Sequence, residues 1–152
     1  MKNKVLWFVI SISIIGFIAF IISTFFYQIA TVYGDSMLPT YKNGSMVIVK
    51  KNYSKIDRDD IIIGKKNKIT FIKRVVGIPH DKLIIKDNKL YVNDILNERF
   101  TNIKESGVLS EEIELKDNEY FVLGDNVNYS VDSRYKGFGI IDKSLINGIV
   151  ID

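Results

Sequence analysis

The longest uncharged stretch of the chain lies near its N-terminus and limits how the rest can fold. No charged residue occurs from Val5 to Gly34, and Val5–Tyr27 consists largely of Ile, Phe, Val and Leu. As a helix, a run of this length can cross a hydrocarbon layer of about 30 Å. We therefore predict a short tail at residues 1–4, a transmembrane anchor at residues 5–27 and a folded domain at residues 28–152.

A cleaved secretory signal is the alternative interpretation of this segment, because the positive "MKNK" precedes an apolar run. The run exceeds the ~7–15 residues of a signal core. Ala19 and Ala30 are the only alanines in the sequence, so it contains no A-x-A cleavage site. These features favour a retained, single-pass anchor in the cell membrane. Lys2 and Lys4 favour a cytoplasmic N-terminus, which would place the domain outside the cytoplasm.

Composition argues against several kinds of site. The chain has no Cys and a single His, so it offers no disulfide, no thiolate zinc site and few ligands for a metal. The formal net charge is +3 with basic and acidic residues interspersed, which gives no basic face for nucleic acid. We expect no metal, no cofactor and no nucleic-acid partner, whereas membrane lipid is an expected partner.

After the apolar run, the sequence predicts a mainly β fold. Short runs rich in β-branched and aromatic residues alternate with Asn, Asp, Gly and Lys, as in strands joined by turns. The predicted strands lie at Ser45–Lys50, Asp60–Gly64, Ile69–Ile78, Lys82–Val92 and Asn118–Gly124. We expect the fourth run to fold as a hairpin around Asp87-Asn88, although Asn-Lys is a weaker turn signal than Asn-Gly. The polar stretch Thr101–Glu119 is predicted to be a surface excursion.

Ser36 lies in "YGDSMLPTY", Tyr33–Tyr41, just behind the uncharged run. A serine attacks a carbonyl only if a base takes its proton. The single histidine, His80, lies in the Pro-containing turn "GIPHD", where a solvated loop histidine is the simpler interpretation. An amine is the other precedented partner of a nucleophilic serine.

Lys73 is the lysine best suited to act as a base. It lies in "TFIKRVVGI", and the neighbours two positions away on its side of a strand, Phe71 and Val75, are apolar. Burial removes water from the amine and lowers its pKa, and a pKa of ~7–8 corresponds to destabilising the ammonium by about 3–4 kcal/mol. Arg74 has similar neighbours, but a guanidinium does not deprotonate in proteins.

The segment "LGDNVNYSVDSRYKGFG", Leu123–Gly139, is a third candidate element. It follows an apolar run and is dense in Gly, Asp, Asn and Ser, which is typical of a structured polar loop and also of an ordinary surface loop. Ser130 could orient a lysine amine through its hydroxyl. Asp132 and Arg134 could hold the loop as a charge pair.

Three motifs together carry a family resemblance. "GDSMLPT" at 34–40, "KRVVGIPHD" at 73–81 and "GDNVNYSVDSR" at 124–134 closely resemble, in this order, the conserved boxes of bacterial type I signal peptidases. The apolar segment before the first box, the connecting "KLYVND" and the terminal "GFGIIDKSLINGIVI" are similar to the same family. The resemblance therefore runs through nearly the whole chain.

This resemblance implies a membrane-anchored serine endopeptidase with an all-β catalytic core that cuts signal peptides from secretory preproteins. Ser36 resembles the family's nucleophile and Lys73 its general base. Ser130 resembles the hydroxyl that binds the lysine amine, and Asp132 with Arg134 resembles the loop-stabilising pair. The substrate is expected to add as an extended strand, with small side chains at the first and third positions before the cut.

Residues for substrate contact are less well defined by the sequence. Apolar positions near Met37 and Pro39, and along Ile69–Val75 with Phe71 among them, are candidates. Three positions depart from the family pattern: Gly34 replaces a serine of some members, His80 replaces the usual Gly, and Val127 replaces the common Arg. We therefore expect His80 at a turn position with positive φ, which His tolerates better than β-branched residues do.

Other functions stay open at this point. Self-cleaving repressors of the LexA type share the serine–lysine chemistry, but the apolar segment and the missing DNA-binding segment argue against them. A non-catalytic, membrane-anchored β module that binds exported proteins is the second alternative. The pairing of Ser36 with Lys73 argues against that alternative, because a binding module needs no nucleophile matched to a base. The sequence does not distinguish a housekeeping peptidase from one that serves a single substrate or a pilus-type pathway.

Overall fold

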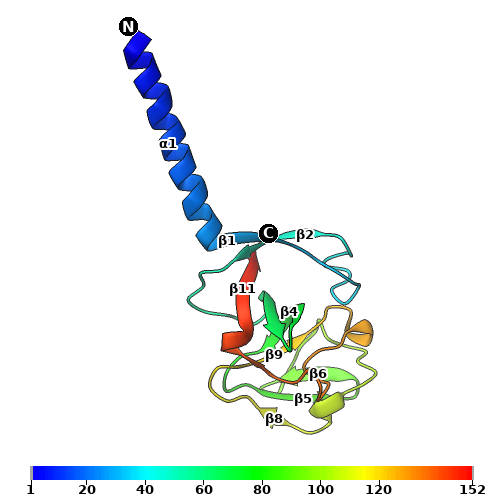
Figure 1. Cartoon of the computed structure of the whole chain (residues 1–152). Coiled ribbons are helices and arrows are strands. Elements are labelled where there is room, and N and C mark those ends of the chain that lie inside the picture. Colours follow the sequence, from blue (N-terminus) through cyan, green and yellow to red (C-terminus); the bar gives the residue numbers. More distant parts are fainter. Residues whose placement is uncertain (1, 152) are drawn as a thin grey trace.

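The computed structural model describes residues 2–151 and consists of one long helix attached to a β domain. The helix α1, Lys2–Phe26, extends away from the domain (Figure 1). Within it, Lys4–Phe26 is long and apolar enough to cross a membrane, and its most apolar stretch is not buried against the domain. The helix ends one residue before the predicted anchor does, because Tyr27 already pairs with Lys50 as the first residue of a strand.

The domain contains two antiparallel sheets, so the predicted mainly β fold is confirmed. The larger sheet has the order β1-β2-β11-β3-β4-β9-β10, and the smaller has the order β7-β6-β5-β8. The larger sheet comprises β1 Tyr27–Thr31, β2 Met46–Lys50, β11 Ile146–Ile151, β3 Ile61–Lys66, β4 Ile69–Gly77, β9 Glu119–Leu123 and β10 Ile141–Asp142. The smaller sheet comprises β7 Ile95–Leu96, β6 Lys89–Val92, β5 Lys82–Lys86 and β8 Ile113–Glu114.

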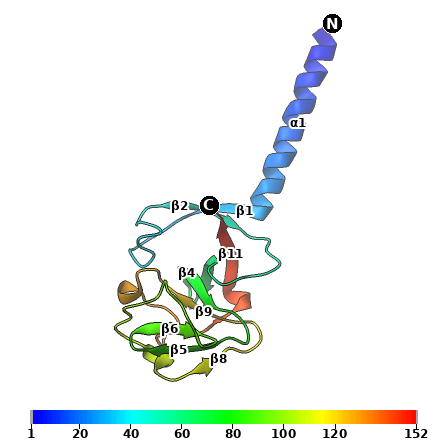
Figure 2. The ribbon, with the colours of Figure 1, turned by 180° about the vertical axis from the view of Figure 1, so that it is seen from behind.

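Short 3₁₀ turns, η1 Gly107–Ser110, η2 Val127–Tyr129 and η3 Lys143–Leu145, complete the described part of the chain. The two views in Figures 1 and 2 both place β5, β6 and β8 at the end of the domain farthest from α1. The strands β1 and β2 and the end of β11 lie beside the base of the helix in both views. The larger sheet therefore carries the side of the domain that faces the helix.

All five predicted strand regions are confirmed as β2, β3, β4, the β5–β6 hairpin and β9. The hairpin turns at Asp87 and Asn88, whose φ angles are 49° and 61°. Positive φ at both central residues is the geometry of the tight turn that matches the twist of a hairpin, and Asp and Asn tolerate it.

The segment Thr101–Glu119 is not simply a surface excursion, so that prediction is only partly right. Its charged side chains are largely exposed, but Ile103, Leu109 and Leu115 are fully buried. These three side chains pack into the core cluster between the smaller sheet and β9. The polar composition of the segment concealed these apolar residues, and Val108 and Ile113 also pack against the same cluster.

The base of α1 is tied directly to the domain. The Lys51 backbone N–H donates to the Phe26 carbonyl at 2.8 Å, and Lys51 Nζ donates to the Thr24 carbonyl at 2.5 Å. The last carbonyls of a helix have no partner within the helix, and these two bonds satisfy part of that requirement. The last turn of the helix is therefore bonded directly to the residue that follows β2.

Candidate active site

The turn that carries Ser36 is fixed by packing below it and by hydrogen bonds at its ends. Met37 is fully buried in the cluster formed by β1, β2 and β3. Gly34 has a φ of 82°, which a glycine adopts without strain, and its N–H donates to Asn43 Oδ1 at 3.0 Å. With Met37 pointing into the core, the Ser36 side chain is left at the edge of a cavity.

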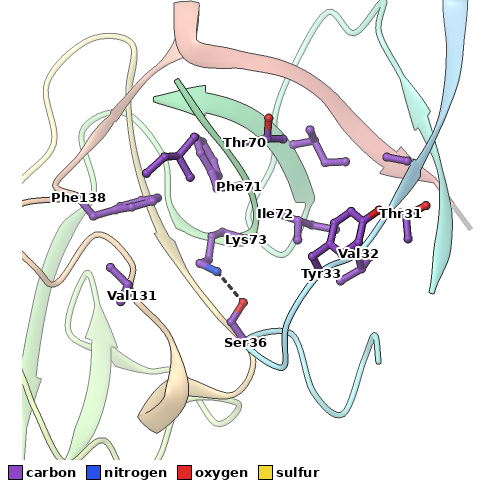
Figure 3. A pocket seen from close by; sticks show the side chains of 13 residues that line it. Thr31, Val32, Tyr33, Ser36, Thr70, Phe71, Ile72, Lys73, Val131 and Phe138 are labelled. Carbon is purple, nitrogen blue, oxygen red and sulfur yellow. Dashed lines mark hydrogen bonds between the residues drawn. The ribbon is translucent and has the colours of Figure 1, made fainter. Parts of the chain in front are cut away.

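Lys73 lies on β4, one residue before the part of this strand that pairs with β9. β4 pairs with β3 through Lys73 opposite Ile62, and with β9 through Arg74 opposite Leu123. The side chain of Lys73 is only 6% exposed. Its Nζ lies 2.7 Å from Ser36 Oγ, which is a hydrogen-bonding distance (Figure 3).

Burial lowers the pKa of Lys73, because water no longer solvates the ammonium form. Asp132 and Asp125 act in the opposite direction through their negative charge, but the effect of burial is larger. A lowered pKa increases the fraction of neutral amine at a given pH, which is the form that can accept a proton.

The two side chains open into a cavity of about 370 Å³. The segment 30–33 forms one wall and residues 69–73 of β4 form another, as Figure 3 shows for the labelled residues. The cavity is lined by Ala30, Thr31, Val32, Tyr33, Ser36, Ile63, Ile69, Thr70, Phe71, Ile72, Lys73, Val131 and Phe138. Most of these side chains are apolar, so the Ser36–Lys73 pair lies in a partly dehydrated cleft.

Ser130 is buried close to this pair, but its hydroxyl has no hydrogen-bond partner among residues 2–151. A Cβ added to Gly124 would meet both Ser130 Oγ and the Ser36 carbonyl oxygen. Gly124 therefore allows the backbone of the first motif to approach the third motif closely. The contact between Ser130 and the lysine amine stays a prediction.

Asp132 and Arg134 are both buried and form a two-point ion pair. Arg134 Nε donates to Asp132 Oδ1 at 2.8 Å, and its terminal nitrogen donates to Oδ2 at 3.0 Å. Arg134 also donates to the carbonyls of Val127 and Glu105, the latter at 3.0 Å. Arg134 therefore connects distant parts of the loop through hydrogen bonds. The Val127 side chain packs into the core cluster.

Sequence reasoning missed a second buried ion pair that joins all three motifs. Arg74 Nε and its terminal nitrogen donate to the two carboxylate oxygens of Asp125, each at 2.7 Å. The Thr40 hydroxyl donates to the same carboxylate. The available signal was the position of Asp125 two residues after the apolar strand β9, but its partners are 51 and 85 positions away.

Asn126 is a further missed residue, and it fastens the Ser36 turn. Its backbone N–H donates to the Ser36 carbonyl and its side-chain amide donates to the Asp35 carbonyl, both at 3.0 Å. Because two consecutive carbonyls are held by one residue, the orientation of the peptide units on either side of Ser36 is fixed.

His80 is not part of this constellation. Its Nε2 lies 2.9 Å from Asp117 Oδ1, and both side chains are exposed. Its φ is 71°, as expected for a position where glycine is usual in the resembled family. His80 is also not among the residues that line the cavity.

The three candidate substrate-contact residues lie in different environments. Phe71 lines the cavity and stacks edge-on against Phe138, with ring centroids 5.3 Å apart. Met37 is buried in the core, and Pro39 is exposed and is not one of the lining residues. Of the three, only Phe71 can reach a molecule in the cavity without a rearrangement of the Ser36 turn.

Comparison with known proteins places these features in a family. Residues 5–151 match the family described as "Signal peptidase, peptidase S26". Signal peptidase I U of Bacillus subtilis is 36% identical over 92% of this chain and 82% of its own length. Signal peptidase IB of Staphylococcus aureus (strain COL) is 33% identical over 99% of this chain and 89% of its own length.

A solved structure agrees with these sequence relatives. The crystal structure of a signal peptidase I from Enterococcus faecalis V583 superposes with a TM-score of 0.52 at 25% identity, covering 66% of this chain and all of that one. The chain belongs to the signal peptidase family. It is accordingly a serine protease of the signal peptidase class, and removal of signal peptides is its function.

Proposed function

We propose that this chain removes signal peptides from secretory preproteins with Ser36 as the nucleophile and Lys73 as the general base. The observation that carries the proposal is the 2.7 Å distance between Lys73 Nζ and Ser36 Oγ at a buried position. Nucleophile and base within hydrogen-bond reach are the recognisable geometry of covalent catalysis.

The proposed reaction starts with the neutral Lys73 amine taking the proton of the Ser36 hydroxyl. Ser36 Oγ then attacks the scissile carbonyl, and the Ser36 backbone N–H is a candidate donor to the oxyanion that forms. The protonated amine next gives its proton to the leaving amine of the mature chain. A water that is deprotonated by Lys73 finally hydrolyses the ester and regenerates the serine.

The supporting residues keep this pair in place. Ser130 is proposed to hydrogen-bond the lysine amine, because its buried hydroxyl is otherwise unsatisfied among the described residues, and such groups are costly. Asp132 and Arg134 are proposed to hold the loop that carries Ser130. Their effect on the reaction is therefore indirect and acts through the position of that hydroxyl.

The preprotein is proposed to bind as an extended strand between the segment 30–33 and residues 69–73 of β4. Among the described residues, β1 is an edge strand and residues 69–73 of β4 pair with β3 alone, so an inserted chain can bond to both walls as an added strand. The apolar lining beside the serine is proposed to receive the small side chains before the cut. Phe71 contributes to this wall, whereas contacts by Met37 and Pro39 stay predictions.

We place residues 5–27 in the membrane, residues 1–4 in the cytoplasm and residues 28–152 outside it. The face of the larger sheet beside α1 supports this arrangement, because Ile29, Ile48 and Ile151 lie in register across β1, β2 and β11 with their side chains exposed. Exposed apolar side chains of this size next to an apolar helix fit contact with lipid. The basic tail fits the cytoplasmic side.

The chemistry is tested by cleavage of a model preprotein with an A-x-A site by the protein in detergent, beside Ser36→Ala and Lys73→Ala. We expect cutting at that site by the unmodified protein and a loss of at least about 10³-fold in each variant. Binding without cutting by the unmodified protein would favour the non-catalytic module instead.

The orientation is tested separately by adding a protease to intact cells or to their spheroplasts. Digestion of the β domain from outside, with protection of an epitope tag added to the N-terminus for the experiment, is the expected result. Protection of the domain until the membrane is broken would reverse the proposed topology.

A further inference from the structure

Asn126 contacts the peptide unit that ends in the Ser36 N–H, and the reaction described above gives it no role. Its side-chain amide donates to the Asp35 carbonyl at 3.0 Å. The Asp35 carbonyl and the Ser36 N–H belong to the same peptide bond. A peptide unit is planar, so a hydrogen bond that holds its oxygen also fixes the direction in which its N–H points. Asn126 therefore controls the direction of the candidate donor to the oxyanion.

The Ser36 N–H is open to an incoming group. It donates to no backbone carbonyl among residues 2–151. Ser36 lines the cavity and is only partly buried. Gly34, two positions earlier, has no side chain that could supply a hydroxyl donor. The direction of this backbone N–H therefore matters more than it would with a side-chain donor at position 34.

The other hydrogen bond to the same carbonyl does not replace the contact with Asn126. The Asp35 carbonyl also accepts from the Leu38 N–H at 3.2 Å, which closes the turn from within. Asn126 lies 91 positions away in the third motif, and its backbone N–H donates to the Ser36 carbonyl at 3.0 Å. The bond from Leu38 can move with the turn, whereas the two bonds from Asn126 hold the turn against a separate segment.

The local structure around Asn126 does not account for the direction of its side chain. Asn126 directly precedes η2, and an asparagine at the start of a helical turn usually accepts a hydrogen bond from the backbone of that turn. The side chain of Asn126 makes no such bond. Its amide instead donates to Asp35, and a hydrogen bond to a carbonyl polarises the peptide unit and strengthens its N–H as a donor.

We propose that Asn126 is a positioning residue for the oxyanion, because its amide orients the Ser36 N–H through the Asp35 carbonyl. The proposal rests on the proposed function, in which Ser36 attacks the scissile carbonyl. Donors to an oxyanion are effective because they are held in place before the charge develops. Asn126 should therefore stabilise the transition state and have little effect on the binding of the substrate.

The first test compares kcat and KM of Asn126→Ala and Asn126→Asp with those of the unmodified full-length protein in detergent, on a preprotein with an A-x-A site. Both variants keep the backbone N–H, and the Asp side chain keeps the shape of Asn but does not donate at neutral pH. Removal of an oxyanion donor lowers kcat by about 10²–10³-fold. Because the Ser36 N–H itself is retained, we expect kcat to fall by about 30-fold and KM to stay within about threefold.

The second test uses two peptide inhibitors with the same A-x-A sequence, one ending in an aldehyde and the other in the corresponding alcohol. With the aldehyde, Ser36 Oγ bonds to the aldehyde carbon, the hydroxyl proton passes to Lys73, and the aldehyde oxygen becomes an oxyanion. The alcohol binds without forming a bond. We expect the ratio of the two affinities to fall by about 30-fold in both Asn126 variants, in step with kcat. A purely structural loss would weaken both inhibitors and leave their ratio unchanged.

Asn128→Ala is the matched control. The Asn128 amide also holds the backbone carbonyl of a distant residue, Asn102, at 3.0 Å, and Asn128 does not line the cavity that holds Ser36. When rates are compared at equal concentrations of folded protein, this variant should keep kcat and the inhibitor ratio within about threefold.

Three outcomes would count against the proposal. A kcat within about threefold in both Asn126 variants, or an unchanged inhibitor ratio, would overturn the role of Asn126 while cleavage by the unmodified protein upheld the proposed function. An equal loss of kcat in Asn128→Ala would overturn it as well, because the rate would then follow general stability. No cleavage by the unmodified protein would overturn the proposed function and the role of Asn126 with it.

Discussion

Gly124→Ala should separate catalytic geometry from stability, because Gly124 lies at the closest approach between two motifs. A Cβ at this position would be 2.5 Å from the Ser36 carbonyl oxygen and would also meet Ser130 Oγ. Ordinary contacts of a Cβ begin near 3.4 Å, so the Ser36 turn must move by about 0.9 Å. The φ of Gly124 lies outside the left-handed region, so alanine adds a clash without backbone strain.

The size of the effect follows from this displacement. A misplacement of about 1 Å in a reacting group can lower the rate by roughly 10²-fold. Overpacking of a well-packed site costs about 1–3 kcal/mol of folding free energy. We therefore expect a variant that is folded at 25 °C but cuts a model preprotein about 100-fold more slowly.

Gly148→Ala is the matched control for the clash. A Cβ there would lie 2.5 Å from Val49 Cγ1 and 2.7 Å from the Lys50 carbonyl oxygen, and none of these three residues lines the cavity that holds Ser36. Both variants should lose similar stability in thermal or denaturant unfolding. Only Gly124→Ala should lose kcat when rates are compared at equal concentrations of folded protein.

The reasoning would be refuted by a Gly124→Ala variant that keeps a kcat within about threefold of the unmodified protein while its stability falls. Such a result would mean that the clash is relieved by Ser130 alone. An equal loss of kcat in Gly148→Ala would show instead that the rate follows general stability and not the position of the Ser36 turn.

Three further predictions concern the buried charges. Because burial lowers the pKa of Lys73 below its usual ~10.5, kcat/KM should rise with pH through that lowered pKa and level off before about 10.5; a flat profile from pH 6 to 10 contradicts a lysine base. The same shift means that the unfolded chain binds the proton more readily than the folded one, so native stability increases with pH up to about 10.5. Lys73→Met should accordingly raise Tm at pH 7, with a gain that shrinks toward pH 10; an equal gain at both pH values in thermal unfolding argues against this linkage. Asp125→Asn leaves the buried Arg74 charge unpaired and should cost about 3–5 kcal/mol in denaturant unfolding, and much of this should be recovered by adding Arg74→Met; a loss below about 1 kcal/mol disproves the pairing.

The parts of the fold that the sequence predicted are those set by local pattern. The Asp87-Asn88 turn could be read from its flanking β-rich runs, because a two-residue hairpin depends on neighbours in the chain. β1 was missed for the opposite reason. Tyr27–Thr31 follows the apolar helix with no charge or turn residue to mark a boundary, and its strand character comes from pairing with β2.

The candidate site was likewise predicted in part from the sequence and missed in part. Chemistry and resemblance pointed to Ser36 and Lys73, and the structure brings these two side chains together. Alternation along β4 could not show which of these two side chains is buried, because Lys73 and Arg74 are both buried. The Arg74–Asp125 pair depends on contacts between distant segments, which no local pattern encodes.

The bonds between Lys51 and the last turn of α1 fix the position of the β domain relative to the helix. Because Thr24 and Phe26 are held to the end of β2, the height of Ser36 above the bilayer follows from the length and rotation of the helix. One residue inserted into the helix would shift what lies beyond it by about 1.5 Å and rotate it by roughly 100°. The number of residues between the apolar segment of a preprotein and its cleavage point would then be matched to a distance that is built into the enzyme.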